Sequence, residues 1–167
     1  MEPVALFGIQ FTLSLLAYAL IAVWYVAPHL ARLPRHAALA PLLWVHAFRV
    51  VGGTILAPGA VDPGVPMAFR TMVGLGDLAT AFLALLALVA LRARLPGAIW
   101  LVWLCLGVGA LDTANAIIQS VGYSVFTYPL GVNWVIVAIY VPALLVSSAL
   151  ILWQLLRRTG DPVASSR

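Results

Sequence analysis

The chain carries little charge and contains no lysine. Only 8% of its 167 residues are charged, whereas a soluble domain carries about 25%. Hydrophobic residues make up 64%, and the mean hydropathy is +1.09. So few charged side chains cannot cover the surface of a soluble domain. The composition therefore predicts an integral membrane protein.

These absences also exclude several kinds of chemistry. Without lysine, the chain has no nucleophile for a Schiff base, which excludes a retinal- or pyridoxal-type linkage. Cys105 is the only cysteine, which excludes an intrachain disulfide and a metal site built from several thiolates. Of the three histidines, only His46 lies inside an expected span, so the chain alone cannot supply a bis-histidine haem. We therefore expect no metal and no cofactor.

The sequence contains five apolar runs long enough to cross a bilayer, for which about 20 residues are needed. The breaks between them carry Pro, Gly or Arg, as helix ends commonly do. We predict an all-α bundle of five transmembrane helices in a single domain, 1–158, followed by a short cytoplasmic tail, 159–167. The expected spans are residues 4–26, 38–57, 68–91, 98–120 and 130–156.

The distribution of arginine predicts the orientation of this bundle. The first connection, the third connection and the end of the chain hold most of the arginines: Arg32, Arg35, Arg92, Arg94, Arg157, Arg158 and Arg167. By the positive-inside rule, the N-terminus lies outside and the C-terminus in the cytoplasm. The net charge of +4 is then a topology signal, so we expect the lipid bilayer as the partner and no nucleic acid. The expected location is the inner membrane of a bacterium.

Several polar residues interrupt the expected spans: His46 and Arg49 in the second, Asp77 in the third, and Asp112 and Asn115 in the fourth. A charged residue at a helix centre costs about 2.5–3.5 kcal/mol on insertion scales. At 1.5 Å per residue, the three charged residues fall about 10–14 Å from the expected outer helix ends. We therefore expect one polar centre in the outer half of the membrane, with glycines beside it that let the helices approach closely.

The polar centre suggests a small membrane protein that binds or transports a small polar or anionic molecule, or a lipid headgroup, from outside. In this hypothesis Arg49 is the electrostatic contact, Asp77 and Asp112 are its counter-ions, His46 is a proton-sensitive neighbour, and Asn115 completes the site. Arginine stays protonated and pairs with one aspartate, so the second aspartate is either neutral or balanced by protonated His46. A structural reading stays open, in which the network only holds helices together within a larger membrane complex or a homo-oligomer.

An enzymatic alternative rests on Gly74-Leu75-Gly76-Asp77. This string matches the GxGD motif of intramembrane aspartyl proteases, for which Asp112 would be the second aspartate. Two carboxylates that share a proton are what such a hydrolysis needs. However, the chain lacks the lysine that follows the aspartate in small prepilin peptidases, and Arg49 at the same level would pair with one carboxylate. No catalytic residue is expected unless this alternative holds.

The pattern as a whole resembles a group of small bacterial five-helix membrane proteins with no assigned activity. The residues that carry the resemblance are His46-Ala47-Phe48-Arg49, Pro58-Gly59, Gly76-Asp77-Leu78, Asp112 with Asn115, and Pro142. It covers most of the chain from the second span onward. The resemblance implies that these polar positions form a recurring set, and it implies no substrate, cofactor or reaction.

Overall fold

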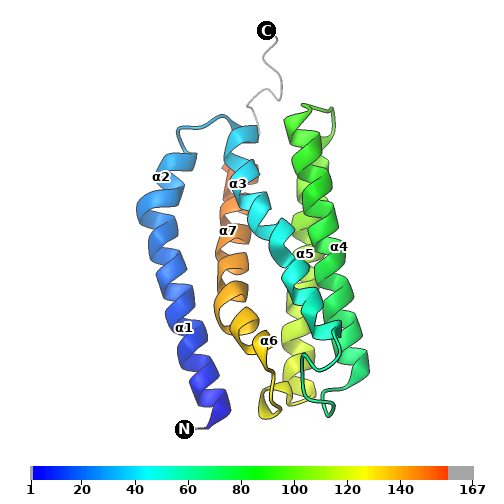
Figure 1. The fold of residues 1–167 in the computed structure, drawn as a ribbon. Helices are drawn as coiled ribbons and strands as arrows, with labels where there is room; N and C mark the ends of the chain where they lie inside the picture. Colours follow the sequence, from blue (N-terminus) through cyan, green and yellow to red (C-terminus); the bar gives the residue numbers. More distant parts are fainter. Residues whose placement is uncertain (1, 158–167) are drawn as a thin grey trace.

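The computed structural model describes residues 2–157, which form helices and short connections (Figure 1). Five helical stretches are long and apolar enough to cross a membrane, which confirms the prediction of five such helices. They are Pro3–Leu30, Arg35–Leu56, Met67–Arg92, Ala98–Gly122 and Val132–Arg157. The expected tail, 159–167, lies outside the described residues.

Within these stretches the helix type changes several times. The elements are α1 (Pro3–Ile21), η1 (Ala22–Val26), α2 (Ala27–Leu30), α3 (Arg35–Ala47), η2 (Phe48–Leu56), α4 (Met67–Arg92), α5 (Ala98–Gly122), η3 (Val125–Thr127), α6 (Val132–Val135), η4 (Ile136–Tyr140) and α7 (Val141–Arg157). The segments η1 and η4 are π-helical, and η2 and η3 are 3-10 helices.

The first two spans have bounds that differ from the predicted ones. The first continues past Val26 to Leu30 although Pro28 lies in it, and the second begins at Arg35 rather than at Ala38. Each π-helical segment ends two residues before a proline, Pro28 or Pro142. A proline cannot donate to the carbonyl four residues earlier, and a π turn changes the bonding pattern just before it. The helix therefore continues through the proline instead of ending there.

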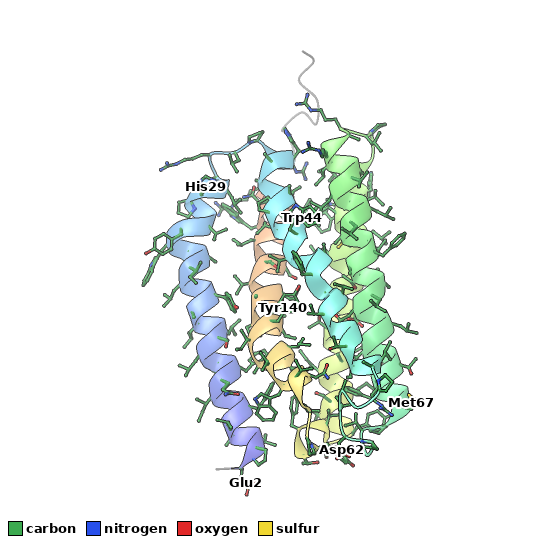
Figure 2. All side chains as sticks on the ribbon, viewed as in Figure 1. Glu2, His29, Trp44, Asp62, Met67 and Tyr140 are labelled. Atoms are coloured by element: carbon green, nitrogen blue, oxygen red, sulfur yellow. The ribbon has the colours of Figure 1, made fainter. Side chains whose placement is uncertain are left out.

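Two ends of the bundle are distinguished below. The N-terminal end holds Glu2 and the connections 57–66 and 123–131, whereas the C-terminal end holds the connections 31–34 and 93–97 and the last turn of α7 (Figure 1). His29 accordingly lies at the C-terminal end, and Asp62 and Met67 lie at the N-terminal end (Figure 2).

The C-terminal end contains the main hydrophobic core. Leucine side chains from α3 and α7 pack there against small residues of α4 and α5. Leu39 and Leu43 of α3 are fully buried, as are Ala84 and Ala87 of α4 and Val102 of α5. Alanine at these positions lets neighbouring helices approach closely, which is how apolar helices associate in a membrane.

At the N-terminal end, the two connections are bonded to each other. The amide of Asp62 donates to the carbonyl of Pro129 at 3.0 Å, and the side chain of Asn133 donates to the carbonyl of Ala60 at 3.2 Å. Gly131 has a φ of +53°, and a Cβ there would lie 2.9 Å from the Ala60 carbonyl oxygen. The chain therefore needs glycine at this contact, and the two connections form one cover over this end.

The α1 helix is the most loosely attached part of the bundle. None of its residues from Pro3 to Ile21 is buried, and it packs on α7, η4 and η3 at one side of the molecule (Figure 1). Its N-terminal end is held by rings: Phe7 stacks on Phe126 with centroids 4.1 Å apart and meets Trp134 edge-on at 5.8 Å. Trp134 also donates its indole N–H to the Gln10 side chain at 2.7 Å.

Candidate functional site

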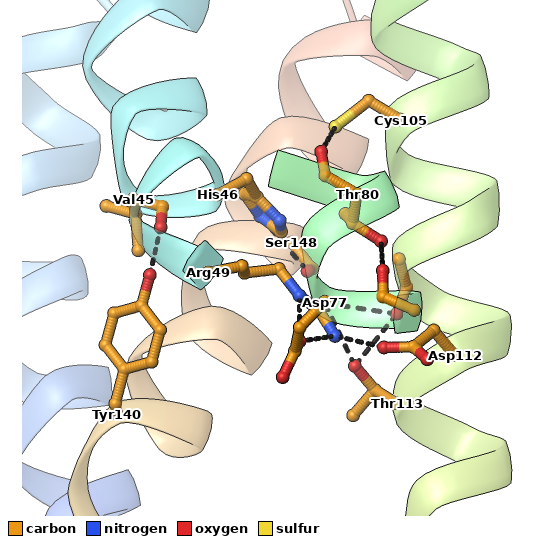
Figure 3. A network of polar contacts seen from close by, with 12 residues as sticks. Val45, His46, Arg49, Asp77, Thr80, Cys105, Asp112, Thr113, Tyr140 and Ser148 are labelled. Atoms are coloured by element: carbon orange, nitrogen blue, oxygen red, sulfur yellow. Dashed lines mark hydrogen bonds and ion pairs between the residues drawn. The ribbon is translucent and has the colours of Figure 1, made fainter. Parts of the chain in front are cut away.

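Arg49 lies inside the bundle, on η2, and is only 3% exposed. The second span is an α-helix up to Ala47 and a 3-10 helix from Phe48 onward. Tyr140, at the end of η4, donates its hydroxyl to the carbonyl of Val45 just before this change (Figure 3). A 3-10 segment within a longer helix often marks a functional position, and here it carries the buried cation.

Two aspartates from two other helices bind the guanidinium of Arg49 (Figure 3). Asp77 of α4 places its Oδ1 2.7 Å from Nε and 2.7 Å from Nη2. Asp112 of α5 places its Oδ2 2.6 Å from Nη2. These are short, charge-assisted contacts. The structure thus brings together the three charged residues that the sequence analysis placed at one level.

The remaining nitrogen of the guanidinium, Nη1, is bonded to α5. It donates to the Gly109 carbonyl at 3.3 Å and to the Thr113 hydroxyl at 3.2 Å. Thr113 in turn donates to the same Gly109 carbonyl at 2.8 Å. All three nitrogens of Arg49 are therefore occupied by acceptors of the protein itself.

Glycines make room for both carboxylates. A Cβ at Gly52 of η2 would lie 1.7 Å from Oδ2 of Asp77, and a Cβ at Gly76 of α4 would lie 1.7 Å from Oδ1 of Asp112. Each helix thus offers a glycine to the aspartate of the next helix along the chain. Any larger residue at either position would push a carboxylate away from Arg49.

The network forms one end of a cavity of about 370 Å³ in the N-terminal half of the bundle. Arg49, Asp77 and Asp112 line it together with side chains that are mostly apolar. The walls come from α1, η2, α4, α5, α7 and the segments between them. The aromatic side chains in the walls are Phe7, Phe11, Phe69, Phe126 and Tyr140. The site is therefore a mostly apolar cavity with charged side chains at one end.

His46 lies beside the network but is bonded elsewhere. It is 1% exposed, and its Nε2 lies 3.1 Å from the Ser147 hydroxyl and 3.5 Å from that of Ser148, both on α7. Its Nδ1 faces Gly109, as Arg49 does, and has no hydrogen-bond partner among the described residues. His46 makes no ion pair with either aspartate within residues 2–157.

Asn115 lies outside the network. It is exposed, and its side-chain amide donates to the Met72 sulfur at 2.8 Å. The sequence analysis placed it in the polar centre with Asp112, but the structure directs it toward Met72 of α4 at the helix surface. It does not line the cavity.

The two aspartates are both bonded to the guanidinium, which joins them. Aspartic proteases need two carboxylates that share one proton directly. The geometry therefore gives no support to the hydrolase alternative built on Gly74-Leu75-Gly76-Asp77. Within residues 2–157 there is also no group of three His, Cys, Asp or Glu side chains arranged to hold a metal ion.

The sequence analysis missed several residues of the site. Thr113 follows Asp112 directly, and consecutive residues of a helix do not share a face, so spacing gave no reason to include it. Phe7 of α1 and Phe126 of η3 also belong to the cavity wall. For Phe7 the reason is that α1 shows almost no distinct apolar face, so its sequence does not indicate which side faces the bundle.

A family model described as a domain of unknown function (DUF8737) matches residues 6–156. The chain belongs to this family. The match covers all five apolar helices, including the Arg49 network and the cavity walls, so the DUF8737 domain and the helical bundle coincide. Comparisons with the curated proteins and with the solved structures each gave no match.

Proposed function

We propose that this DUF8737 protein binds a small molecule, or the headgroup region of a lipid, in the cavity beside Arg49. One observation carries the proposal. The charged residues join the closely packed elements η2, α4 and α5 and also border a chamber of about 370 Å³, within the usual range of about 300–1,000 Å³ for ligand sites. Apolar walls with a few convergent polar groups are the usual composition of such a site.

The sequence favoured a polar or anionic ligand held by Arg49. The walls favour instead a ligand that is apolar over most of its surface and polar at one end. Transport across the membrane requires a second opening in addition to binding, so binding is the simpler function and the one that we test. The cavity lies in the N-terminal half of the bundle, which the arginine distribution places toward the outside of a bacterial inner membrane.

The test uses three probes of one shape: 3-phenylpropylammonium, 3-phenylpropan-1-ol and 3-phenylpropionate. We expect at least one of them to raise the thermal unfolding midpoint of the full chain in maltoside detergent, because a ligand bound only by the folded state stabilises it. The midpoint should rise with probe concentration and saturate.

A pair of variants tests whether the cavity is the place of binding. Ala116 lines the cavity, whereas Ala114 on the same helix is exposed and does not line it. Ala116→Trp should abolish the stabilisation by the probe, and Ala114→Trp should keep it. Loss in both variants, or in neither, contradicts the proposal, as does the absence of a saturable shift with all three probes.

A structural role is the second candidate, because the network joins three helices, η2, α4 and α5. A cohesive network needs no ligand, and a subunit of a complex would cover the exposed surface of α1. In that case, extraction from native membranes in mild detergent should yield a stoichiometric protein partner, and none of the three probes should bind.

The orientation is tested separately from binding. We expect a C-terminal green fluorescent protein fusion to fluoresce in a bacterial host, and a C-terminal alkaline phosphatase fusion to be inactive, because the C-terminus is proposed to lie in the cytoplasm. The reverse pair of results would place the cavity in the inner half of the membrane.

A further inference from the structure

The charges that line the cavity do not balance. One arginine meets two aspartates, Asp77 and Asp112, at its polar end. The buried His46 of the same span is bonded to serines of α7 rather than to a carboxylate. Arginine stays protonated in proteins, so it matches one carboxylate only. The second carboxylate lacks a cation within the described network.

Acceptors are also in surplus at this end of the cavity. All three nitrogens of Arg49 already meet protein oxygens. In contrast, Oδ2 of Asp77 and Oδ1 of Asp112 accept no hydrogen bond from any residue within 2–157. The side chains keep 14% and 10% of their surface exposed. These two oxygens lie against Gly52 and Gly76 and keep lone pairs that no protein donor uses, whereas no charged donor is left over.

A carboxylate or phosphate ligand would have to break a bond of Arg49 with an aspartate and would leave that aspartate unpaired and buried. Such an exchange is unfavourable, because an uncompensated buried charge is strongly destabilising. A positively charged donor needs no such exchange, because it adds hydrogen bonds and supplies the missing counter-charge. The rings of Phe7, Phe69 and Phe126 in the cavity wall also suit a cationic or apolar ligand better than an anionic one.

We propose that the ligand of this cavity is an organic ammonium ion with an apolar body, whose N–H groups bind Asp77 and Asp112 while its body lies among the aromatic side chains. The inference rests on the proposed function and specifies its ligand class. The same ammonium group occurs in a free hydrophobic amine and in the headgroup of an aminophospholipid, so the experiment includes both sources.

The first experiment compares the three probes on the unmodified protein at constant ionic strength, with sodium chloride as the salt control. The ammonium probe should bind at least tenfold more tightly than the alcohol and the carboxylate, as measured by titration calorimetry in detergent. Equal or tighter binding of the carboxylate probe would overturn the ammonium assignment. Because no variant is needed, misfolding cannot obscure the result.

The second experiment compares two variants, each of which replaces one aspartate by asparagine. Asp112→Asn keeps the side-chain shape and removes the surplus charge, so the affinity for the ammonium probe should fall at least tenfold while that for the alcohol stays within about threefold. Asp62→Asn is the control, because Asp62 lies in the connection 57–66, where it accepts from the Gly64 amide at 2.7 Å. That variant should keep the parent affinity.

The source of the ammonium is tested in lipid nanodiscs. If an aminophospholipid is the occupant, then phosphatidylethanolamine discs should reduce the affinity for 3-phenylpropylammonium relative to phosphatidylcholine discs, and Ala116→Trp should remove the difference. Equal affinity in the two kinds of disc identifies a free amine as the ligand. Both results keep the ammonium assignment.

The two proposals fail in different ways. If the alcohol or carboxylate probe binds as well as the ammonium probe and is blocked by Ala116→Trp, the cavity binds ligands but the ammonium assignment is wrong. If no probe binds saturably, the proposed function fails as well.

Discussion

At the C-terminal end of the bundle, Leu39, Leu43 and Val102 are fully buried against the alanines of α4, and the helices fit together without charged groups. At the N-terminal end, η2, α4 and α5 also approach closely, with Asp77 against Gly52 and Asp112 against Gly76. However, a cavity of about 370 Å³ borders Arg49, Asp77 and Asp112 there. Both regions belong to the same five helices. The difference is that side chains fill the main core, whereas one side of the charged network borders a cavity.

The difference also concerns helix geometry. The main core is formed largely by regular α-helix, whereas η2, η3 and η4 all contribute residues to the cavity wall. Groups that are unfavourable for stability are commonly retained where activity needs them. The comparison therefore assigns stability to the C-terminal end and supports the ligand site proposed for the N-terminal end.

The largest effect is expected when Arg49 loses both partners. The double variant Asp77→Asn with Asp112→Asn leaves a buried guanidinium without a counter-charge, which should cost about 3–5 kcal/mol of unfolding free energy. Arginine cannot escape by releasing its proton. The single variant Asp112→Asn should cost about 1 kcal/mol or less, the usual net contribution of one hydrogen bond, because Asp77 still supplies a counter-charge and holds Nε and Nη2. Chemical unfolding in mixed micelles measures both.

The loss of unfolding free energy in the single variant Asp112→Asn shows whether the network serves stability alone. If Asp112→Asn alone were as destabilising as the double variant, both carboxylates would be needed to hold the helices together. The N-terminal end would then be a structural centre like the C-terminal one, and the contrast between the two ends would be lost.

A second comparison truncates one aliphatic side chain to alanine at each end. Leu43 is fully buried in the main core, so Leu43→Ala should cost about 2–5 kcal/mol through the cavity that it creates. Val137 already borders the existing cavity, so Val137→Ala should cost about 1 kcal/mol or less. Thermal unfolding of the two variants in one detergent checks the order, and equal losses would mean that the N-terminal end is packed as tightly as the core.

The third prediction concerns the glycines that receive the carboxylates. Gly52→Ala should cost about 1–3 kcal/mol as an overpacking change, because its Cβ would lie 1.7 Å from Oδ2 of Asp77. Gly107→Ala is the control, since nothing lies within 4 Å of its Cβ position. The glycine argument fails if the unfolding midpoints of the two variants coincide.

The smallest effect is expected from Tyr140→Phe. This change removes the hydroxyl that donates to the carbonyl of Val45 and keeps the ring in the cavity wall. The loss of one such hydrogen bond should cost about 0.5–1.5 kcal/mol. Affinity for the ammonium probe should stay within about threefold of the parent, and a larger loss would show that the hydroxyl contacts the ligand.

Much of this arrangement could be predicted from the sequence. Long apolar runs fix the number of helices, because few other structures satisfy the backbone in lipid. The unusual position of Arg49, Asp77 and Asp112 within those runs indicates that they pair, because unpaired charges are expensive there. The estimate of how deep each residue lies in its helix, at about 1.5 Å per residue, is enough to predict that these three side chains meet.

Other parts could not be predicted, for physical reasons. The cavity depends on how far α1 stands from the other helices, and a helix that is apolar on every side does not indicate its packing face. The direction of the His46 ring and the exposure of Asn115 depend on helix rotation, which a span of residues does not specify. The π and 3-10 segments shift that rotation further.

The pairing of Gly52 with Asp77 and of Gly76 with Asp112 also bears on how the protein is made. Asp77 follows Arg49 by 28 residues and Asp112 follows it by 63, so the helices that carry Arg49 and Asp77 leave the ribosome before the helix that carries Asp112. Together they can enter the bilayer as a hairpin with balanced charge. The helix α5, which carries Asp112, arrives later and brings the unmatched carboxylate. The proposed binding site therefore acquires its surplus negative charge only when α5 docks.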